Sequence, residues 1–140
     1  MSVVSVSEHL QELRVLVKRL VEEHRRFASD IDELHRSALS QEETGGLQVV
    51  FTLLQDGLTE HILVEEFEVY PEIMRRSLFD ASVSSIMQQH VDVVSSLGRM
   101  ELSLRSKNLA EFNAALEELT RVLRLHQPAE EEKVFPLAIG

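Results

Sequence analysis

The sequence contains no cysteine. Disulfide bonds, iron–sulfur clusters, thiolate nucleophiles and cysteine-based zinc sites are therefore excluded. Tryptophan is also absent, only 5% of the residues are aromatic, and no run of alternating β-branched residues indicates a strand. The composition favours an all-α protein, and any metal that it binds must be held by histidine and carboxylate side chains.

Long hydrophobic runs and excess positive charge are missing too. No stretch reaches the roughly 20 apolar residues that a membrane-spanning helix needs, and the N-terminal residues lack the basic flank and apolar run of a secretion signal. The formal net charge of −10 opposes binding to phosphate backbones and to anionic lipid headgroups. These absences predict a cytoplasmic protein with no nucleic-acid partner and no membrane partner.

The size and the capping signals predict one helical domain. With 140 residues, of which 44% are hydrophobic, the chain has enough apolar material for a single core spanning residues 1–140. Four residues are candidate helix N-caps: Ser5, Ser40, Asp80 and Asn108. They separate amphipathic segments at 6–38, 44–75, 81–104 and 109–136. Because the connections are short, neighbouring helices should be antiparallel, which predicts an up-down-up-down four-helix bundle.

Polar residues interrupt the apolar stripe of every segment. They are His24 in the first, His61 and Glu65 in the second, His90 in the third, and His126 and Glu130 in the fourth. The second and fourth segments share a phrase, HILVEEFEVYP at 61–71 and HQPAEEEKVFP at 126–136, with an offset of 65 residues. The histidines of the first and third segments are 66 residues apart. The chain therefore consists of two similar helical hairpins.

This pattern of histidine and glutamate is suited to metal binding. Residues four apart lie on the same face of a helix, so His61 and Glu65 can reach one ion, or the carboxylate can bridge two. An imidazole supplies a nitrogen ligand, and a carboxylate supplies charge. Without a cation, unpaired charges in the core would cost several kcal/mol each. The sequence therefore predicts metal binding by six residues at one level: His24, His61, Glu65, His90, His126 and Glu130.

Residues next to these six are expected to have supporting roles. Glu66 and Glu131 each follow a proposed ligand and project about 100° away from it, so they are predicted to be solvated or to orient a neighbouring imidazole. Tyr70 and Phe135 are predicted to pack in the core at the ends of their helices.

The prolines and the two remaining histidines complete the expectations. Pro71 is predicted to bend or end the second helix, and Pro128 to kink the fourth helix and re-aim His126. His9 and His35 are predicted to lie at the surface.

The duplicated phrase resembles the hemerythrin-like family, also described as the HHE cation-binding domain, over nearly the whole chain. The resemblance implies a four-helix bundle with a non-haem di-iron centre, oxo- or hydroxo-bridged. Glu65 and Glu130 would be the bridges, and four histidines the terminal ligands: His24, His61, His90 and His126. Oxygen-carrying members have a second histidine four residues after the one on the third helix, where this sequence has Val94.

The donor count favours redox chemistry over oxygen carriage. Two imidazoles and two shared carboxylates leave about one open position on each six-coordinate ion, and a symmetric pair of vacancies suits peroxide better than end-on oxygen. The leading hypothesis is a protein that decomposes or reduces peroxide or reacts with oxygen, as a monomer or homodimer. Two alternatives stay open: a sensor or store for oxygen, nitric oxide or iron, and a helical interaction module. Manganese or zinc would fit the same ligands, and a role in iron-centre repair is disfavoured.

Overall fold

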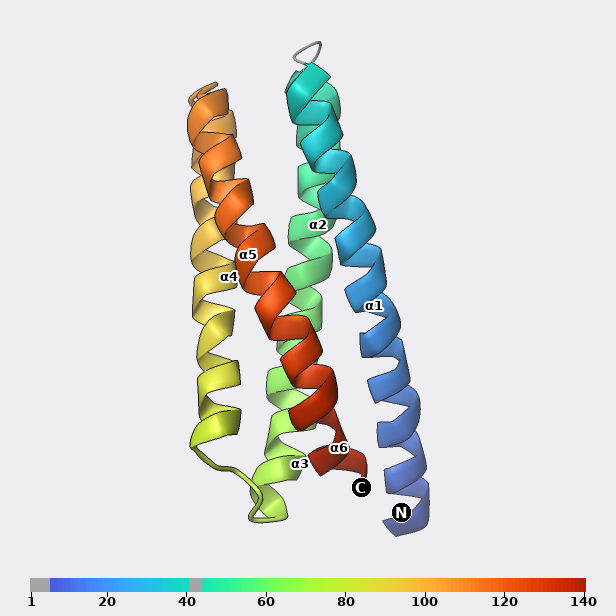
Figure 1. Cartoon of the computed structure of the whole chain (residues 1–140). Helices are drawn as coiled ribbons and strands as arrows, with labels where there is room; N and C mark the ends of the chain where they lie inside the picture. Colours follow the sequence, from blue (N-terminus) through green and yellow to red (C-terminus); the bar gives the residue numbers. More distant parts are fainter. Residues whose placement is uncertain (1–5, 41–43) are drawn as a thin grey trace.

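The computed structural model describes residues 6–40 and 44–140, which form four long helical segments that run alternately up and down (Figure 1). The first segment is α1 (Val6–Ser40), and the second joins α2 (Thr44–Val64), the π-helix η1 (Glu65–Val69) and α3 (Tyr70–Arg75). The third segment is α4 (Ala81–Arg105), and the fourth joins α5 (Leu109–Lys133) and α6 (Phe135–Ile139). No strand occurs among these residues, and the predicted all-α, up-down-up-down bundle is confirmed.

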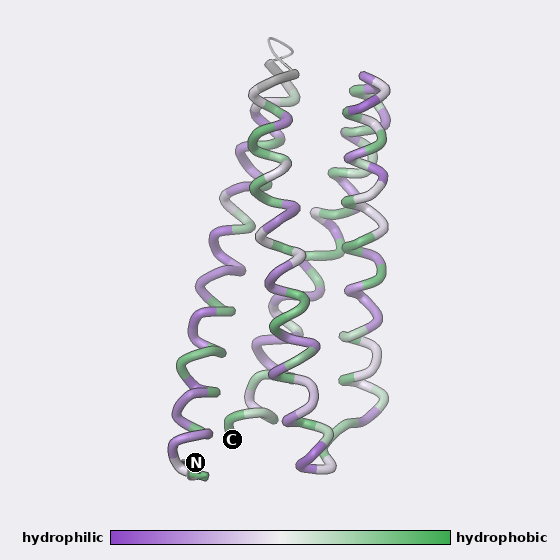
Figure 2. The backbone as a smooth tube through the Cα atoms, turned by 180° about the vertical axis from the view of Figure 1, so that it is seen from behind, coloured by the Kyte–Doolittle hydropathy of each residue, from purple (hydrophilic) through white to green (hydrophobic). Residues whose placement is uncertain are grey.

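The helices form because each has an apolar face that is buried by its neighbours. Figure 2 shows hydrophobic and hydrophilic residues alternating along every helix at the helical period. α1 packs against α2 and α5, and α4 packs against α5 and α2. Within the described ranges, no helix combines the length and the apolarity that crossing a bilayer would require.

The buried apolar residues form two clusters with a polar layer between them. On α1, Leu20 belongs to the cluster near the termini and Phe27 to the larger cluster at the other end of the bundle. On α4, Ile86 and Val93 are divided in the same way. Each helix therefore passes through a level that belongs to neither cluster, and His24 and His90 lie at that level.

Two of the predicted N-caps are confirmed. The Asp80 side chain accepts a hydrogen bond from the Val83 backbone N–H, at 3.0 Å, where α4 begins. The Asn108 side chain accepts one from the Glu111 N–H, at 3.1 Å, where α5 begins. These bonds satisfy backbone donors that have no partner within the helix. The predicted caps at Ser5 and at Ser40 depend on side chains outside the described residues.

Two helices end in the same way, with a residue in the left-handed region. Ser77 has φ 57° after α3, and Lys107 has φ 55° after α4. In each case the next residue donates to a carbonyl five positions earlier, Leu78 to Ile73 and Asn108 to Ser103. This hydrogen-bond pattern reverses the chain sharply and leads directly into the next helix.

The second and fourth segments are less regular than predicted. In the second, the Tyr70 N–H donates to the Glu65 carbonyl, which makes the wider turn of η1, and Pro71 occupies the first turn of α3. In the fourth, α5 continues through Pro128 to Lys133, so the helix is not interrupted at the predicted kink. The interruption falls at Val134, two residues before Pro136.

Candidate metal centre

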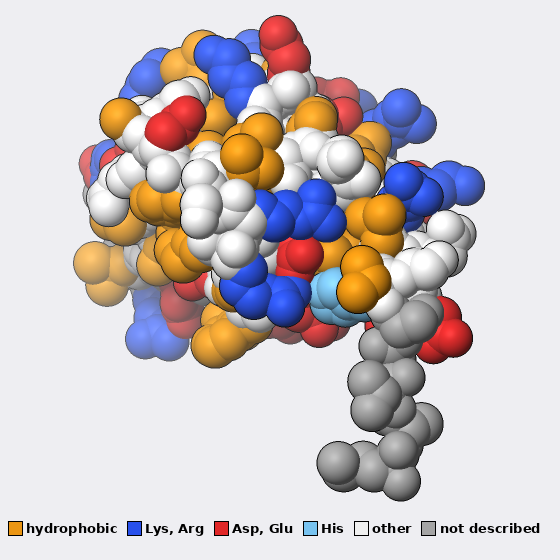
Figure 3. Space-filling model, turned by 90° about the horizontal axis from the view of Figure 1, so that it is seen from below, with side chains coloured by type: hydrophobic (Ala, Val, Ile, Leu, Met, Phe, Trp, Pro, Cys, Tyr) orange, Lys and Arg blue, Asp and Glu red, His pale blue; other side chains and the backbone are white. Residues whose placement is uncertain are grey.

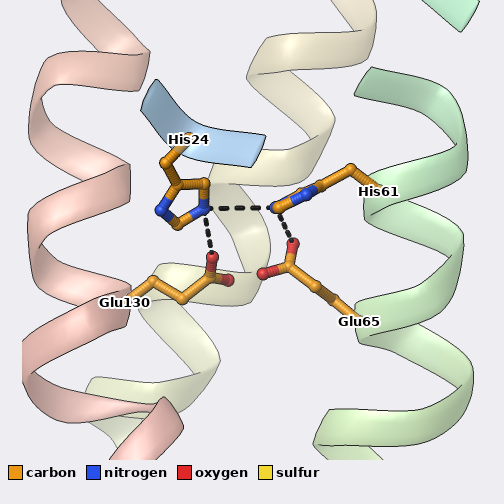
Figure 4. A group of neighbouring side chains, drawn as sticks. All are labelled: His24, His61, Glu65 and Glu130. Carbon is orange, nitrogen blue, oxygen red and sulfur yellow. Dashed lines mark hydrogen bonds and ion pairs between the residues drawn. The ribbon is translucent and has the colours of Figure 1, made fainter. Parts of the chain in front are cut away.

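All six predicted ligands lie in the polar layer, and all six are buried. The four histidines are 3–4% exposed, and Glu65 and Glu130 are completely buried. Figure 4 shows His24 from α1, His61 from α2, Glu65 from η1 and Glu130 from α5 pointing toward one another. Residues from four helical segments therefore meet at one level of the core.

The six side chains form two overlapping groups, each with two histidines and both carboxylates. One contains His24 and His61, the other His90 and His126, and in each group ligand atoms lie within 4.8 Å of one another. The imidazole ring centroids are 4.9 Å apart in both pairs. The two hairpins thus build two equivalent half-sites that share Glu65 and Glu130.

The Nε2 atoms of all four imidazoles face the shared carboxylates. His24 Nε2 lies 3.1 Å from Glu130 Oε1, and His126 Nε2 lies 3.4 Å from Glu130 Oε2. Glu130 therefore presents one oxygen to each pair. The Oε1 atom of Glu65 lies 3.4 Å from His61 Nε2 and 3.1 Å from His90 Nε2.

Three carboxylate oxygens in this layer lack a hydrogen-bond partner in the part of the chain that the structure describes. They are both oxygens of Glu65 and Oε1 of Glu130. Leaving such groups unpaired in the core is unfavourable by several kcal/mol. Imidazole nitrogens and carboxylate oxygens are ligands for divalent transition metals. The arrangement therefore fits cations held between the two carboxylates.

Without a cation the two carboxyl groups must divide a limited amount of negative charge. Burial raises the pKa of Glu65 well above its usual range, and repulsion from Glu130 raises it further. Burial also opposes ionisation of Glu130, but hydrogen bonds from Glu65, His126 and His24 lower its pKa well below its usual range. Glu130 thus carries the charge, and Glu65 keeps the proton until a cation displaces it.

The imidazoles also respond to burial in different ways. Burial lowers the pKa of His61 to about 4. Burial and repulsion from His126 lower the pKa of His90. In His24, burial is outweighed by hydrogen bonds to Glu130 and Glu131, which raise its pKa. Neutral imidazoles are the form that binds metal, so His61 and His90 are ready to act as ligands.

The outward-facing Nδ1 atom of every histidine has its own partner. Glu131 contacts His24 at 2.9 Å and Glu66 contacts His90 at 3.2 Å, in agreement with the prediction that these glutamates orient imidazoles. Two more partners lie on neighbouring helices: Glu23, 2.8 Å from His61, and Gln89, 2.8 Å from His126. An acceptor at Nδ1 places the proton there and leaves Nε2 free for a metal.

Tyr70 has a larger role than the predicted packing at a helix end. Its side chain is 1% exposed, and its hydroxyl donates to Glu130 Oε2 at 2.6 Å and lies 3.2 Å from His90 Nε2. Sequence reasoning missed Glu23, Gln89 and Tyr70. The repeat contained a signal for the first two, because they precede His24 and His90 directly and are 66 residues apart.

The position compared with the additional histidine of oxygen carriers does not face the site. Val94 is 57% exposed, so an imidazole there would extend into solvent. The neighbours of His90 that face the core are Ile86 and Val93, which are 5% and 1% exposed. The ring of Tyr70 lies in the same apolar cluster as Ile86. A phenol and an aliphatic side chain therefore occupy the space beside His90.

His9 and His35 lie outside the polar layer, and both are only partly exposed. His9 Nε2 lies 3.2 Å from Glu72 Oε2, and Arg75 also contacts this carboxylate. His35 Nε2 lies 3.2 Å from the Thr120 hydroxyl. Figure 3 looks onto the end that carries both termini and shows a histidine among basic and acidic side chains. Both histidines thus make contacts between helices rather than lying free at the surface.

A small cavity of about 10 Å³ adjoins the ligands. It is lined by the four histidines, Glu65 and Gln127 together with the apolar side chains Leu58, Ile62, Val93 and Leu123. This volume is about that of one water-sized probe. The site therefore has room for a molecule of only a few atoms.

The fold and the polar layer together define a helical-bundle protein with a buried histidine and carboxylate site that can hold cations. The hemerythrin HHE cation-binding domain matches residues 11–138, and the chain belongs to this family. Comparison with curated proteins and comparison with solved structures found no significant match. Metal binding through histidine and glutamate is thus supported both by the family and by the geometry.

Proposed function

We propose that the chain holds two iron ions in the polar layer and uses them to react with hydrogen peroxide or oxygen. The observation that supports this proposal is the sharing of two carboxylates by two histidine pairs, with three carboxylate oxygens that have no partner among the described residues. A single cation would leave one histidine pair without a metal. Two cations account for all six side chains.

Each residue then has a defined role. His24 and His61 bind one ion, His90 and His126 bind the other, and Glu65 and Glu130 lie between them. The partners at Nδ1 fix the tautomer and the direction of each ring. The Tyr70 hydroxyl holds Glu130 Oε2, which keeps that carboxylate in a single orientation. These contacts preorganise the ligands before a metal arrives.

Bound iron would supply the electron exchange that none of the side chains in this layer provides. In peroxide disproportionation, one hydrogen peroxide is reduced to two waters while another is oxidised to oxygen, so atoms and electrons balance without another reductant. The residues contribute exclusion: the cavity of about 10 Å³ admits a peroxide-sized molecule, and Leu58, Ile62 and Leu123 keep bulk water out. Larger organic donors would have to react at the surface.

The test is to mix iron-loaded protein with hydrogen peroxide and to follow oxygen release and peroxide loss by stopped flow. We expect oxygen release faster than from the same concentration of free iron, and none from zinc-loaded protein, because zinc has no redox chemistry. His61→Ala should lose the excess rate together with bound iron. Rates equal to those of free iron would overturn the proposal.

A second candidate is a reversible sensor or store for oxygen, nitric oxide or iron. The small enclosed cavity favours it, since a site with room for a few atoms suits a diatomic ligand. Its signature is a reversible optical change on adding and removing nitric oxide or oxygen, without peroxide turnover. Elemental analysis of the purified protein separates iron from manganese or zinc, and less than one ion per chain would count against both candidates.

A further inference from the structure

The partners of the four Nδ1 atoms follow the internal repeat with one exception. Glu66 and Glu131 are equivalent positions in the two hairpins, and each contacts a histidine of the other hairpin. Glu23 and Gln89 are also equivalent positions, and each contacts the histidine of the next helix within its own hairpin, at 2.8 Å. Three partners are carboxylates, and the fourth is an amide.

This exception falls on one half-site. The His24 and His61 imidazoles donate to two carboxylates, Glu131 and Glu23. For the His90 and His126 pair, the partners are one carboxylate and the neutral Oε1 of Gln89. A carboxylate acceptor strengthens an imidazole as a metal ligand more than an amide does, because its negative charge polarises the Nδ1–H bond.

Tyr70 shifts the balance in the same direction. Its hydroxyl donates to Glu130 Oε2, the oxygen that faces His90 and His126. The other oxygen, Oε1, faces His24 and has no hydrogen-bond partner in the described structure. A hydrogen bond from a phenol withdraws electron density from the oxygen that accepts it, so Glu130 is the weaker ligand on the His90 side.

We infer that Gln89 makes the two cation positions unequal, so that the His24–His61 position fills first and binds more tightly, and the His90–His126 position fills second and empties first. This inference rests on the proposed two-ion centre. It adds an order of loading, and it identifies the second position as the one at which a cation is more readily exchanged.

Zinc binding to the metal-free protein tests the inference without redox chemistry. We expect two dissociation constants separated by roughly tenfold or more, the size of effect that second-shell partners have on metal affinity. Gln89→Glu should tighten the weaker constant by about tenfold and leave the stronger one unchanged. Glu23→Gln, the matched change in the other hairpin, should weaken the stronger constant. Circular dichroism checks that both variants remain helical.

Imidazole nitrogen NMR assigns the two constants to their positions. At one equivalent of zinc, the Nε2 signals of His24 and His61 should shift before those of His90 and His126. Equal constants in the original protein, no effect of Gln89→Glu, or shifts that begin at His90 and His126 would overturn the inference. Binding of only one zinc ion would refute the two-ion function instead, and the same spectra would still show which pair holds that ion.

Discussion

Val69 is followed by tyrosine in the first hairpin (α1 to α3), and Val134 is followed by phenylalanine in the second (α4 to α6). The Tyr70 hydroxyl reaches across to Glu130, whereas the Phe135 ring stacks against His24 at a centroid distance of 5.9 Å. Equivalent positions thus make a polar contact in one hairpin and an apolar contact in the other. The duplicated sequence places the ligands symmetrically, and single substitutions next to them make the two halves different.

The ends of the two hairpins differ in the same region. In the first, Tyr70 donates to the carbonyl of Glu65, five residues earlier, and the chain stays helical through α3. In the second, Val134 donates to the carbonyl of Glu130, four residues earlier, and α6 turns away to pack against α1 and α3 (Figure 1). A proline follows in both, so the missing N–H alone does not decide between a wide turn and a break.

Replacing the shared carboxylates is the strongest test of the symmetry between the hairpins. Glu65→Gln and Glu130→Gln should each reduce bound metal from two ions to one or none, measured by elemental analysis after dialysis. In the metal-free protein the two variants should differ. Glu65→Gln should be neutral or stabilising, because the carboxyl is protonated there, whereas Glu130→Gln should destabilise by about 3 kcal/mol, because an ionised and hydrogen-bonded group is lost.

Exposed Glu132 provides the control for that comparison. Glu132→Gln should change neither metal content nor the free energy of unfolding by more than about 0.5 kcal/mol. Equal destabilisation by the two buried substitutions in the metal-free protein would show that the carboxylates share their charge evenly.

A pH series on the metal-free protein separates the two imidazoles of the first hairpin. Burial lowers the pKa of His61 to about 4. The unfolded state therefore binds a proton that the folded state excludes, and stability should fall as pH decreases from about 6.5 toward 4, by about 3 kcal/mol from this group. His24 has a raised pKa and contributes the opposite dependence, stabilising below about pH 6.5 and losing this effect as pH rises.

Denaturant unfolding of the metal-free protein at pH 7 and pH 4.5 measures this difference. His61→Gln should flatten the pH dependence, and His24→Gln should steepen it. The same slope in both variants would contradict the assignment of the opposite shifts to these two histidines.

Tyr70→Phe converts the first hairpin to the residue found in the second. The substitution removes the hydrogen bond to Glu130, which we expect to lower the free energy of unfolding by about 2 kcal/mol, the usual size for a bond to a charged acceptor. Urea unfolding measures it. A loss below about 0.5 kcal/mol would mean that the hydroxyl contributes little to holding Glu130 in place.

Much of this architecture could be predicted from the sequence because helical periodicity determines which residues face the core. His24, Glu65 and Glu130 fall on apolar stripes, so their burial and convergence follow from spacing alone. The contacts of Glu23 and Gln89 could not be deduced in this way. These residues lie beside the stripes, and only the distances between helices decide whether they reach an imidazole on the neighbouring helix.

The same limit applies to the helix ends. The Tyr70 and Phe135 rings were correctly expected in the core, but a hydroxyl that finds a carboxylate on another helix has no signature along the chain. The break at Val134 is similar. Pro128 and Pro136 carry the same local signal, yet α5 continues past the first and ends before the second. Packing of α6 against α1 and α3 separates the two outcomes.

The smallest effect that we predict compares a glycine in each hairpin, Gly57 in α2 and Gly98 in α4. A Cβ atom at Gly98 would meet nothing within 4 Å, so Gly98→Ala should stabilise the protein by about 1 kcal/mol through helix propensity alone. A Cβ atom at Gly57 would lie 3.1 Å from Cε1 of Phe27, which is completely buried. Because that ring has little room to move, Gly57→Ala should gain less or lose stability. Thermal unfolding of both variants measures the difference, and equal stabilisation would show that the core around Phe27 adjusts easily.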